Sequence, residues 1–296
     1  MAKKILLFIL CWSSILFSSE RYVKPALITA AAIVATYAAY KGYVYYHAIK
    51  NPGTPIRFNE KVDSDVITIF AHGIADTHAQ VNNYVDLGII KGRGYTFNFP
   101  DATQSIFRVN HAQSSLAQES EIECLKNVIE HAALEKKPII LYGLSRGAST
   151  IINLLATYSN PYIKAIVLES PFDSMQTVTN NMIKQMGIER VPGIRKLTNY
   201  LVEKIFGNYK TDGVHPINCC TQLPTHIPTL IICSKEDALV PYQSSVAIYN
   251  ELIKSHHSKV RLLITEHGKH GKIIHGPDSE QVRKTVKQFY GHYKKI

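Results

Sequence analysis

Short apolar runs alternate with amphipathic segments along the chain from residue 60 onward. The runs are rich in β-branched and aromatic residues and have the length of buried strands, and they lie at 66–71, 95–99, 139–142, 165–168, 229–233 and 260–265. Segments with apolar residues at helical spacing lie at 114–134, 148–158, 242–255 and 279–293. This order predicts an α/β fold, in which helices cover both faces of a mainly parallel central sheet.

One connection, from residue 174 to residue 227, is far too long for an ordinary link between two elements. It contains helical pieces at 178–186 and 194–206, and we expect it to form a helical lid inserted into the domain. Its apolar side chains either line an acyl pocket or pack against the body of the domain. These side chains are Met182, Met186, Ile188, Leu197, Leu201, Val202, Ile205 and Phe206.

Residues 1–50 have the character of a targeting region. Two lysines at positions 3 and 4 precede an apolar run at 5–17, which is the polarity order of a secretory signal. No small-x-small cleavage site follows the run, so an uncleaved signal anchor is the alternative to a cleaved signal peptide. We therefore expect an exported or membrane-associated protein.

A second apolar run, at 26–40, reaches the length of a membrane span only if it continues toward residue 49. It is either a marginal span or a packed amphipathic helix. The turn-rich linker at 51–55 then marks the start of the folded domain, which we expect to occupy residues 51–296. Membrane association would therefore occur through the N-terminal region.

Residues 143–147 have the pattern G-x-S-x-G. They follow the predicted strand at 139–142 directly and open a helix, which is the context of a nucleophile elbow. In such an elbow a strained turn exposes the serine, and only very small residues fit two positions before and after it. Ser145 is therefore the candidate nucleophile.

Further residues with catalytic potential follow other predicted strands. His72 and Gly73 come at the end of the first strand, and an acidic pair followed by Leu239, Val240 and Pro241 comes after the strand at 229–233. The remaining candidates at strand ends are Asp173, Glu236, Asp237, His267, His270 and His275.

With these motifs in this order, residues 62–293 resemble the α/β-hydrolase superfamily, in the branch of small lipases, esterases, thioesterases and prolyl-oligopeptidase-like serine hydrolases. The resemblance implies that Asp237 and His270 are the acid and the base of a Ser-His-Asp triad with Ser145. It also implies that the backbone N–H groups of Ile74 and Arg146 form an oxyanion hole.

Alternatives remain open for two of these positions. Glu236 and Asp173 are alternative acids, and Ser234 stands where the family's acid turn usually has glycine. His267 and His275 are alternative bases. We expect His72 to hold its loop rather than to act as the base.

Composition excludes several classes of protein. The chain has 296 residues, of which 46% are hydrophobic and 19% charged, and this is the range of globular proteins. A net charge of +10 raises the question of an anionic partner, but basic runs and interleaved aromatic residues of the kind that bind nucleic acid are absent from the sequence. The five cysteines have neither the pairing pattern of a disulfide scaffold nor metal-ligand spacing.

These features predict a serine hydrolase that cleaves a carboxylic ester, of a small molecule or a lipid, without a metal or another cofactor. An apolar lid and a basic surface favour lipid or acyl esters over other substrates. The alternatives are a serine peptidase of the same fold and a non-catalytic, membrane-anchored binding protein. We expect no nucleic acid partner.

Overall fold

The computed structural model describes residues 35, 36, 38, 39, 51–102 and 111–293. The chain divides into two compact units, Met1–Ala48 and Ile49–Ile296. In the first unit the described residues are helical and exposed, and the apolar runs predicted there otherwise lie outside the described residues. None of the described helices is both long enough and apolar enough to cross a membrane.

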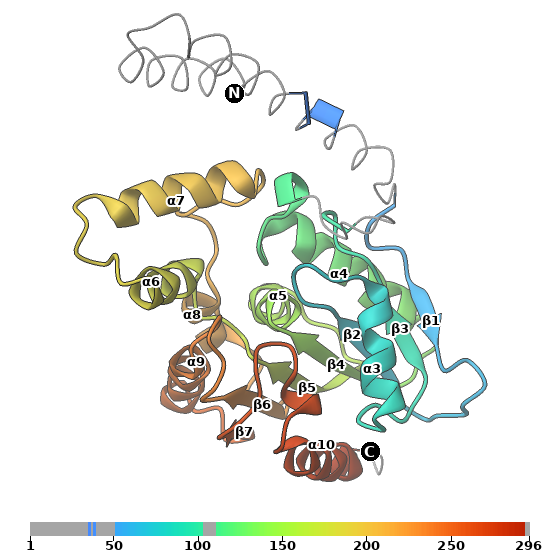
Figure 1. The fold of residues 1–296 in the computed structure, drawn as a ribbon. Coiled ribbons are helices and arrows are strands. Elements are labelled where there is room, and N and C mark those ends of the chain that lie inside the picture. The colour runs from blue at the N-terminus through green and yellow to red at the C-terminus, as the bar shows by residue number, and fades with distance from the viewer. Residues whose placement is uncertain (1–34, 37, 40–50, 103–110, 294–296) are drawn as a thin grey trace, which may run out of the picture. The chain divides into compact units, whose positions relative to one another are not determined.

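The second unit is built around a 7-stranded sheet with the order β1-β3-β2-β4-β5-β6-β7 (Figure 1). β1 pairs with β3 in antiparallel orientation, and the other pairs are parallel. The sheet therefore confirms the predicted α/β fold with a mainly parallel sheet. The strands are β1 (Ile56–Phe58), β2 (Ile67–Ala71), β3 (Gly94–Thr96), β4 (Ile139–Leu144), β5 (Ile163–Glu169), β6 (Thr229–Ser234) and β7 (Val260–Thr265).

Helices cover both faces of the sheet, and each face has its own apolar core. One core joins the sheet to α4 (Glu119–Ala133), α5 (Arg146–Leu155) and α9 (Tyr242–Lys254). The other joins it to α3 (Val81–Asp86) and α10 (Ser279–Tyr293). Because both faces are covered, every residue of β2, β4 and β6 is buried, and this explains why these strands are continuous apolar runs in the sequence.

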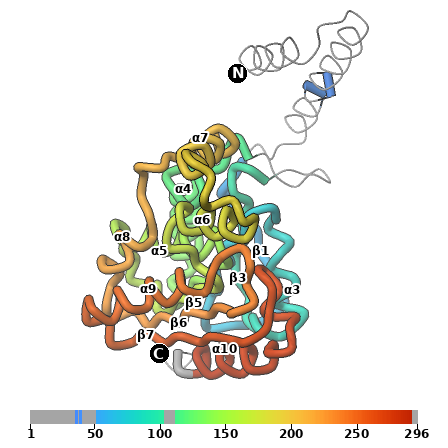
Figure 2. Tube along the Cα trace, turned by 60° about the vertical axis from the view of Figure 1, so that its left-hand side comes forward, coloured from blue at the N-terminus to red at the C-terminus, as the bar shows by residue number. Residues whose placement is uncertain are grey.

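The segment between β5 and β6 carries α6 (Met175–Gln185), α7 (Ile194–Ile205), α8 (Pro216–Cys219) and the short 3-10 helix η3 (Cys220–Gln222). The side chain of Ser174 caps the start of α6 by accepting a hydrogen bond from the N–H of Thr177. In both views α6 and α7 lie side by side, at the end of the domain away from α10 (Figures 1 and 2). This segment corresponds to the predicted lid at 174–227, and we call it the lid segment below.

Some element boundaries differ from the sequence prediction. The helix predicted to begin at residue 114 begins at Glu119, because Leu116 and Ala117 have positive φ angles of 49° and 74°, which are incompatible with a helix. The strand predicted at 95–99 ends at Thr96. The short elements β1 and α3 were not predicted.

Candidate active site

Ser145 lies in a sharp turn between β4 and α5, with φ of 52° and ψ of −112°. A hydrogen bond joins the turn to the end of β5, because the N–H of Ser145 donates to the carbonyl of Glu169 at 2.7 Å. A Cβ on Gly143 would lie 2.5 Å from the backbone nitrogen of Ala148, and one on Gly147 would lie 2.1 Å from the carbonyl oxygen of residue 71. Both glycines of the motif are therefore required by backbone atoms that approach them closely.

Ser145, His270 and Asp237 form a continuous hydrogen-bonded chain. Nε2 of His270 lies 2.9 Å from Oγ of Ser145, and Nδ1 of His270 lies 2.7 Å from Oδ2 of Asp237. Oδ1 of Asp237 accepts hydrogen bonds from the N–H groups of Leu239 and Val240. With a carboxylate facing Nδ1, the proton of a neutral imidazole lies on that nitrogen, and Nε2 is left to accept the hydrogen of the serine hydroxyl.

The alternative acids and bases lie outside this chain. Glu236 accepts a hydrogen bond from the N–H of Gly268, and Asp173 accepts one from the hydroxyl of Ser244. His267 and His275 are exposed, and neither has a hydrogen bond to Ser145 among those the described residues make.

His72 is completely buried beside the elbow. Its Nε2 accepts from the N–H of Phe99 at 3.2 Å, so that Nδ1 carries the hydrogen and donates to the carbonyl of Gly73 at 2.8 Å. Burial and the nearby Arg146 guanidinium hold the pKa of His72 well below its usual value. A neutral imidazole with both nitrogens engaged holds its loop and cannot serve as the base at Ser145.

Ile74 and Arg146, the residues predicted to supply oxyanion-hole amides, line the same cavity as Ser145. The carbonyl of Gly73 accepts from Nη2 of Arg146 at 3.0 Å as well as from His72. In a trans peptide the carbonyl and the following N–H point in opposite directions, so anchoring this carbonyl directs the N–H of Ile74 away from the buried guanidinium. Neither the N–H of Ile74 nor that of Arg146 donates a hydrogen bond to another described residue.

The side chain of Arg146 is buried behind the nucleophile. Its Nη1 donates to Oδ2 of Asp101 at 2.5 Å and to Oε1 of Glu121 at 3.3 Å, and its guanidinium carbon lies 4.4 Å from the centre of the Phe99 ring. Burial raises the pKa of Glu121, and the charge of Arg146 opposes this effect. The guanidinium therefore joins the elbow, the Gly73 loop and α4 through one buried network.

Glu169 is a further buried carboxylate near the elbow. Its Oε2 accepts hydrogen bonds from the hydroxyls of Tyr142 at 2.8 Å and Tyr84 at 3.1 Å. Burial raises the pKa of Glu169 to about 7, although both tyrosine hydrogen bonds act in the opposite direction. This carboxyl therefore changes its charge near neutral pH, at the end of the strand that supports Ser145.

Sequence reasoning did not identify Asp101, Glu121 or Glu169 as parts of the site. The sequence pattern does indicate one of them, because Glu121 shares its helix face with the buried residues Leu125 and Val128. A charged residue on the apolar face of a helix indicates a buried partner of opposite charge.

Ser145 lies at the wall of a cavity of about 460 Å³. The rest of its lining is mostly apolar and comes largely from the lid segment and from the loop after β6. These side chains include Leu116, Phe172, Met175, Val178, Met182, Ile183, Met186, Ile188, Leu201, Val202, Ile205, Phe206, Leu239 and Val240.

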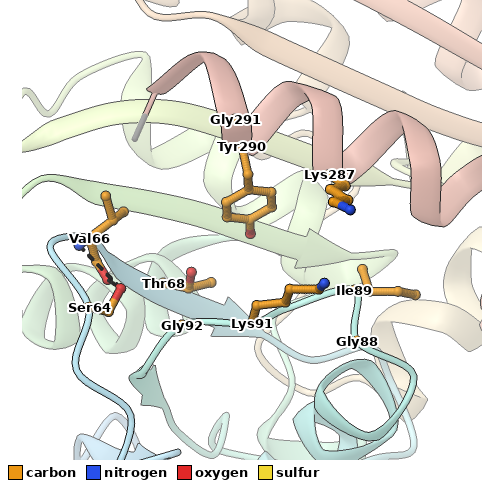
Figure 3. A pocket seen from close by; sticks show the side chains of 10 residues that line it. All are labelled: Ser64, Val66, Thr68, Gly88, Ile89, Lys91, Gly92, Lys287, Tyr290 and Gly291. Carbon is orange, nitrogen blue, oxygen red and sulfur yellow. Dashed lines mark hydrogen bonds between the residues drawn. The ribbon is translucent and has the colours of Figure 1, made fainter. Parts of the chain in front are cut away.

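A smaller cavity, of about 190 Å³, lies elsewhere in the domain, between α10 and the start of β2. Figure 3 shows Tyr290 and Lys287 of α10 facing Thr68 and Lys91 across it. None of the predicted site residues lines this cavity.

Comparison with known proteins agrees with the fold. Over residues 117–296, more than half of the chain, the sequence matches the model of the prolyl oligopeptidase family, and this stretch contains Ser145, Asp237 and His270. The uncharacterized protein YfhR of Escherichia coli strain K12 is 28% identical over 146 residues. That match covers 49% of this chain and 42% of YfhR, so it spans less than half the length of this relative.

Solved structures share the fold at low identity. An esterase from Pyrococcus furiosus superposes with a TM-score of 0.58 and 20% identity over 77% of this chain and 82% of its own. The Pyrococcus horikoshii acylaminoacyl peptidase superposes with a TM-score of 0.56 and 18% identity over 82% of this chain and 41% of its own. The chain belongs to the prolyl oligopeptidase family and has the α/β-hydrolase fold.

Proposed function

We propose that Ser145, His270 and Asp237 are a catalytic triad that hydrolyses carboxylic esters with an apolar acyl group. The observation that carries this proposal is the position of Ser145, which is hydrogen-bonded to His270 and stands at the wall of the large apolar cavity. A small-molecule or lipid ester would place its acyl chain in this cavity and its carbonyl beside the serine.

In the first half of the reaction, Nε2 of His270 takes the hydroxyl proton of Ser145 as Oγ attacks the ester carbonyl carbon. Asp237 stabilises the resulting imidazolium, and the N–H groups of Ile74 and Arg146 donate to the oxyanion. His270 then gives its proton to the alkoxide that leaves, and the acyl group stays on Ser145. Water, activated by His270 in the same way, releases the acid and restores the serine.

The lining of the cavity favours an ester with an apolar acyl chain. Apart from Arg146, whose guanidinium is engaged with Asp101 and Glu121, the described residues that line the cavity are uncharged. No carboxylate among these described residues offers a partner for the amino terminus of a peptide. A long apolar chain gains from burial here, because each methylene group that leaves water contributes about 0.8 kcal/mol.

A second candidate function is a serine peptidase, and the family match favours it. The two activities use the same triad and differ in the leaving group and in the groups that hold the substrate.

The esterase and peptidase activities are distinguished by comparing p-nitrophenyl esters of increasing acyl length with aminoacyl nitroanilides. We expect kcat/KM to rise with acyl length toward medium chains and to exceed that for the nitroanilides. Preferential cleavage of the nitroanilides would overturn the ester proposal in favour of the peptidase.

The triad itself is tested with a fluorophosphonate probe. Wild-type protein should be labelled, and Ser145→Ala should lose labelling without an appreciable change in its thermal midpoint, because the serine hydroxyl contributes little to the fold. His270→Ala should lose nearly all turnover, whereas His267→Ala and His275→Ala, which change exposed side chains, should retain most of it. Labelling that persists in Ser145→Ala would refute the assignment. Failure of wild-type protein to react would indicate a non-catalytic binding protein.

We also propose that residues 1–50 direct export or anchor the protein at a membrane. The lysines at positions 3 and 4, followed by the apolar run 5–17, support this proposal. Mass spectrometry of the N-terminus after expression with a functioning secretion system would distinguish a cleaved signal from a retained anchor. Full-length protein recovered from the soluble cytoplasmic fraction would contradict both forms of the proposal.

A further inference from the structure

Most of the large apolar side chains that the described residues expose belong to the lid segment, and together they form its exposed apolar surface. We call this surface the lid face. It comprises Met182, Met186, Val191, Leu197, Tyr200, Leu201 and Ile205, from α6, α7 and the connection between them. An exposed apolar surface of this kind indicates an interaction site, because folded proteins rarely leave a large contiguous apolar patch in water.

α7 contributes most of the lid face. None of its residues is buried, although its apolar side chains follow a helical period. Leu201 and Ile205 line the cavity at Ser145, whereas Leu197 and Tyr200 do not, and their side chains are 52% and 55% exposed. Because Leu197 lies one turn before Leu201, the outer apolar surface of α7 continues directly into the lining of the cavity.

Exposed basic residues alternate along the chain with the residues of the lid face. The stretch from 184 to 204 contains Lys184, Arg190, Arg195, Lys196 and Lys204, against the acidic residues Glu189 and Glu203. None of these basic side chains forms an ion pair with another described residue. Lys204 instead lies 5.3 Å from the ring centre of Tyr200. The net charge of this stretch is therefore positive, and its basic side chains are available to bind an anionic partner.

We propose that the lid face is a docking surface for an anionic lipid bilayer. An apolar helix face bordered by lysine and arginine suits the boundary between acyl chains and anionic headgroups, where the long basic side chains reach the headgroups. The positive charge of this surface complements the negative potential of such a membrane. Because the same apolar surface leads into the cavity, a docked molecule would receive its acyl substrates from the bilayer. This last step rests on the proposed esterase function, whereas docking does not.

The test measures binding of full-length protein to vesicles, in the Ser145→Ala background so that catalysis does not enter. The vesicles are phosphatidylcholine alone or an equimolar mixture of phosphatidylcholine and phosphatidylserine, and bound protein is measured by flotation. The lid variant carries Leu197→Glu and Tyr200→Glu, which are exposed positions outside the cavity lining. The control variant carries Leu134→Glu and Ile253→Glu, which change charge equally at apolar positions that are 77% and 48% exposed, the first just after the end of α4 and the second in α9.

Because an N-terminal anchor would act on both kinds of vesicle, the lid face is measured by the excess of binding to the mixed vesicles over binding to phosphatidylcholine alone. We expect this excess to be about equal for wild-type protein and the control variant, and about tenfold smaller for the lid variant. Binding of wild-type protein should also fall with added salt, because salt screens the basic residues. Equal binding by the lid variant and the control variant would overturn the proposal and assign any membrane contact to another part of the chain.

Three further measurements separate membrane docking from misfolding, from self-association and from an effect on the active site. Thermal midpoints of both variants should match that of the wild type, because the substituted side chains are exposed. If light scattering shows that the wild type is a dimer and the lid variant is a monomer with unchanged vesicle binding, a second copy of the chain covers the lid face and the proposal is overturned. With Ser145 restored, the lid variant should hydrolyse a soluble short ester as fast as wild type, so a loss confined to vesicle-borne esters identifies docking and not the active site.

Discussion

Replacing Arg146 by methionine would remove the cation that neutralises the buried carboxylates behind the nucleophile. The guanidinium is 1% exposed, the side chains of Asp101 and Glu121 are fully buried, and both carboxylates lie within 3.3 Å of Nη1. Methionine has a similar length and can fill much of the space beside the ring of Phe99. The substitution therefore tests the charge and hydrogen bonds of Arg146 more than its volume.

The loss of unfolding free energy depends on the hydrogen bonds that the two carboxylates keep after the substitution. Removing one partner of a buried ion pair costs about 3–5 kcal/mol, because the other charge is left without compensation. Glu121 keeps hydrogen bonds from the hydroxyl of Ser114 and the N–H of Ala117, whereas Oδ2 of Asp101 loses the hydrogen bond it accepts from Arg146. We expect Arg146→Met to lower the free energy of unfolding by about 4 kcal/mol near pH 8, a loss that a domain of ordinary stability survives.

The pH dependence identifies the cause. Burial already raises the pKa of Glu121 and Arg146 opposes it, so removal of Arg146 raises this pKa further. A carboxyl whose folded-state pKa is raised destabilises the folded state at high pH, and this penalty disappears as the pH falls below the folded-state pKa. The deficit of Arg146→Met relative to wild type should therefore shrink between pH 8 and about pH 5.

Urea unfolding at both pH values measures this deficit. A deficit below about 1 kcal/mol, or one of equal size at both pH values, would refute the argument that uncompensated buried charge dominates. The double variant Arg146→Met with Asp101→Asn should be more stable than Arg146→Met at pH 8, because it removes one of the two orphaned charges. Turnover of the single variant should also fall, mainly in kcat, because the carbonyl of Gly73 loses one of the two donors that orient the N–H of Ile74.

Three other predictions follow from the same site. Asp237→Asn should lower kcat in an ester assay by roughly three to four orders of magnitude and leave KM nearly unchanged, and a loss below tenfold would contradict its role. The folded state keeps the proton of Glu169 up to its pKa of about 7, whereas the unfolded state releases it at lower pH, so the wild type loses stability as the pH rises from about 5 to 8. The thermal midpoint of Glu169→Gln should therefore gain relative to that of the wild type over this range; an unchanged difference would contradict this. Gly147→Ala should destabilise the protein severely, because its Cβ would lie 2.1 Å from the carbonyl oxygen of Ala71, whereas Gly291→Ala, with open space around it, should melt like wild type.

The parallel strands could be predicted because both faces of the sheet are covered. β4 and β6 bury every residue, so they appear in the sequence as unbroken apolar runs. β1 has three residues at the edge of the sheet, including the half-buried Ile56 and the exposed Arg57, and such a short segment has no recognisable period. The start of α4 was misplaced because the positive φ angles of Leu116 and Ala117 depend on packing and are not typical of those residue types.

The candidate triad residues could be selected because each follows a strand of a parallel sheet. The carboxyl ends of β4, β6 and β7 meet at one edge, so loops far apart in the sequence bring Ser145, Asp237 and His270 together. The buried network behind them could not be predicted in this way. Asp101 lies on a loop and Arg146 inside the motif, and no local pattern indicates that the two form a buried pair.

The lid segment shows how far a hydrophobic pattern can be interpreted. A helical period identifies which side chains share a face, as it does for Leu197, Leu201 and Ile205, but not what that face meets. In the structure these side chains line the cavity or remain exposed, and none of them is buried against the body of the domain. The choice of partner therefore needs a second property of the same surface, and here it is charge. The unpaired basic residues beside the lid face favour an anionic bilayer over a neutral apolar partner, and they make the salt dependence of vesicle binding the decisive observation.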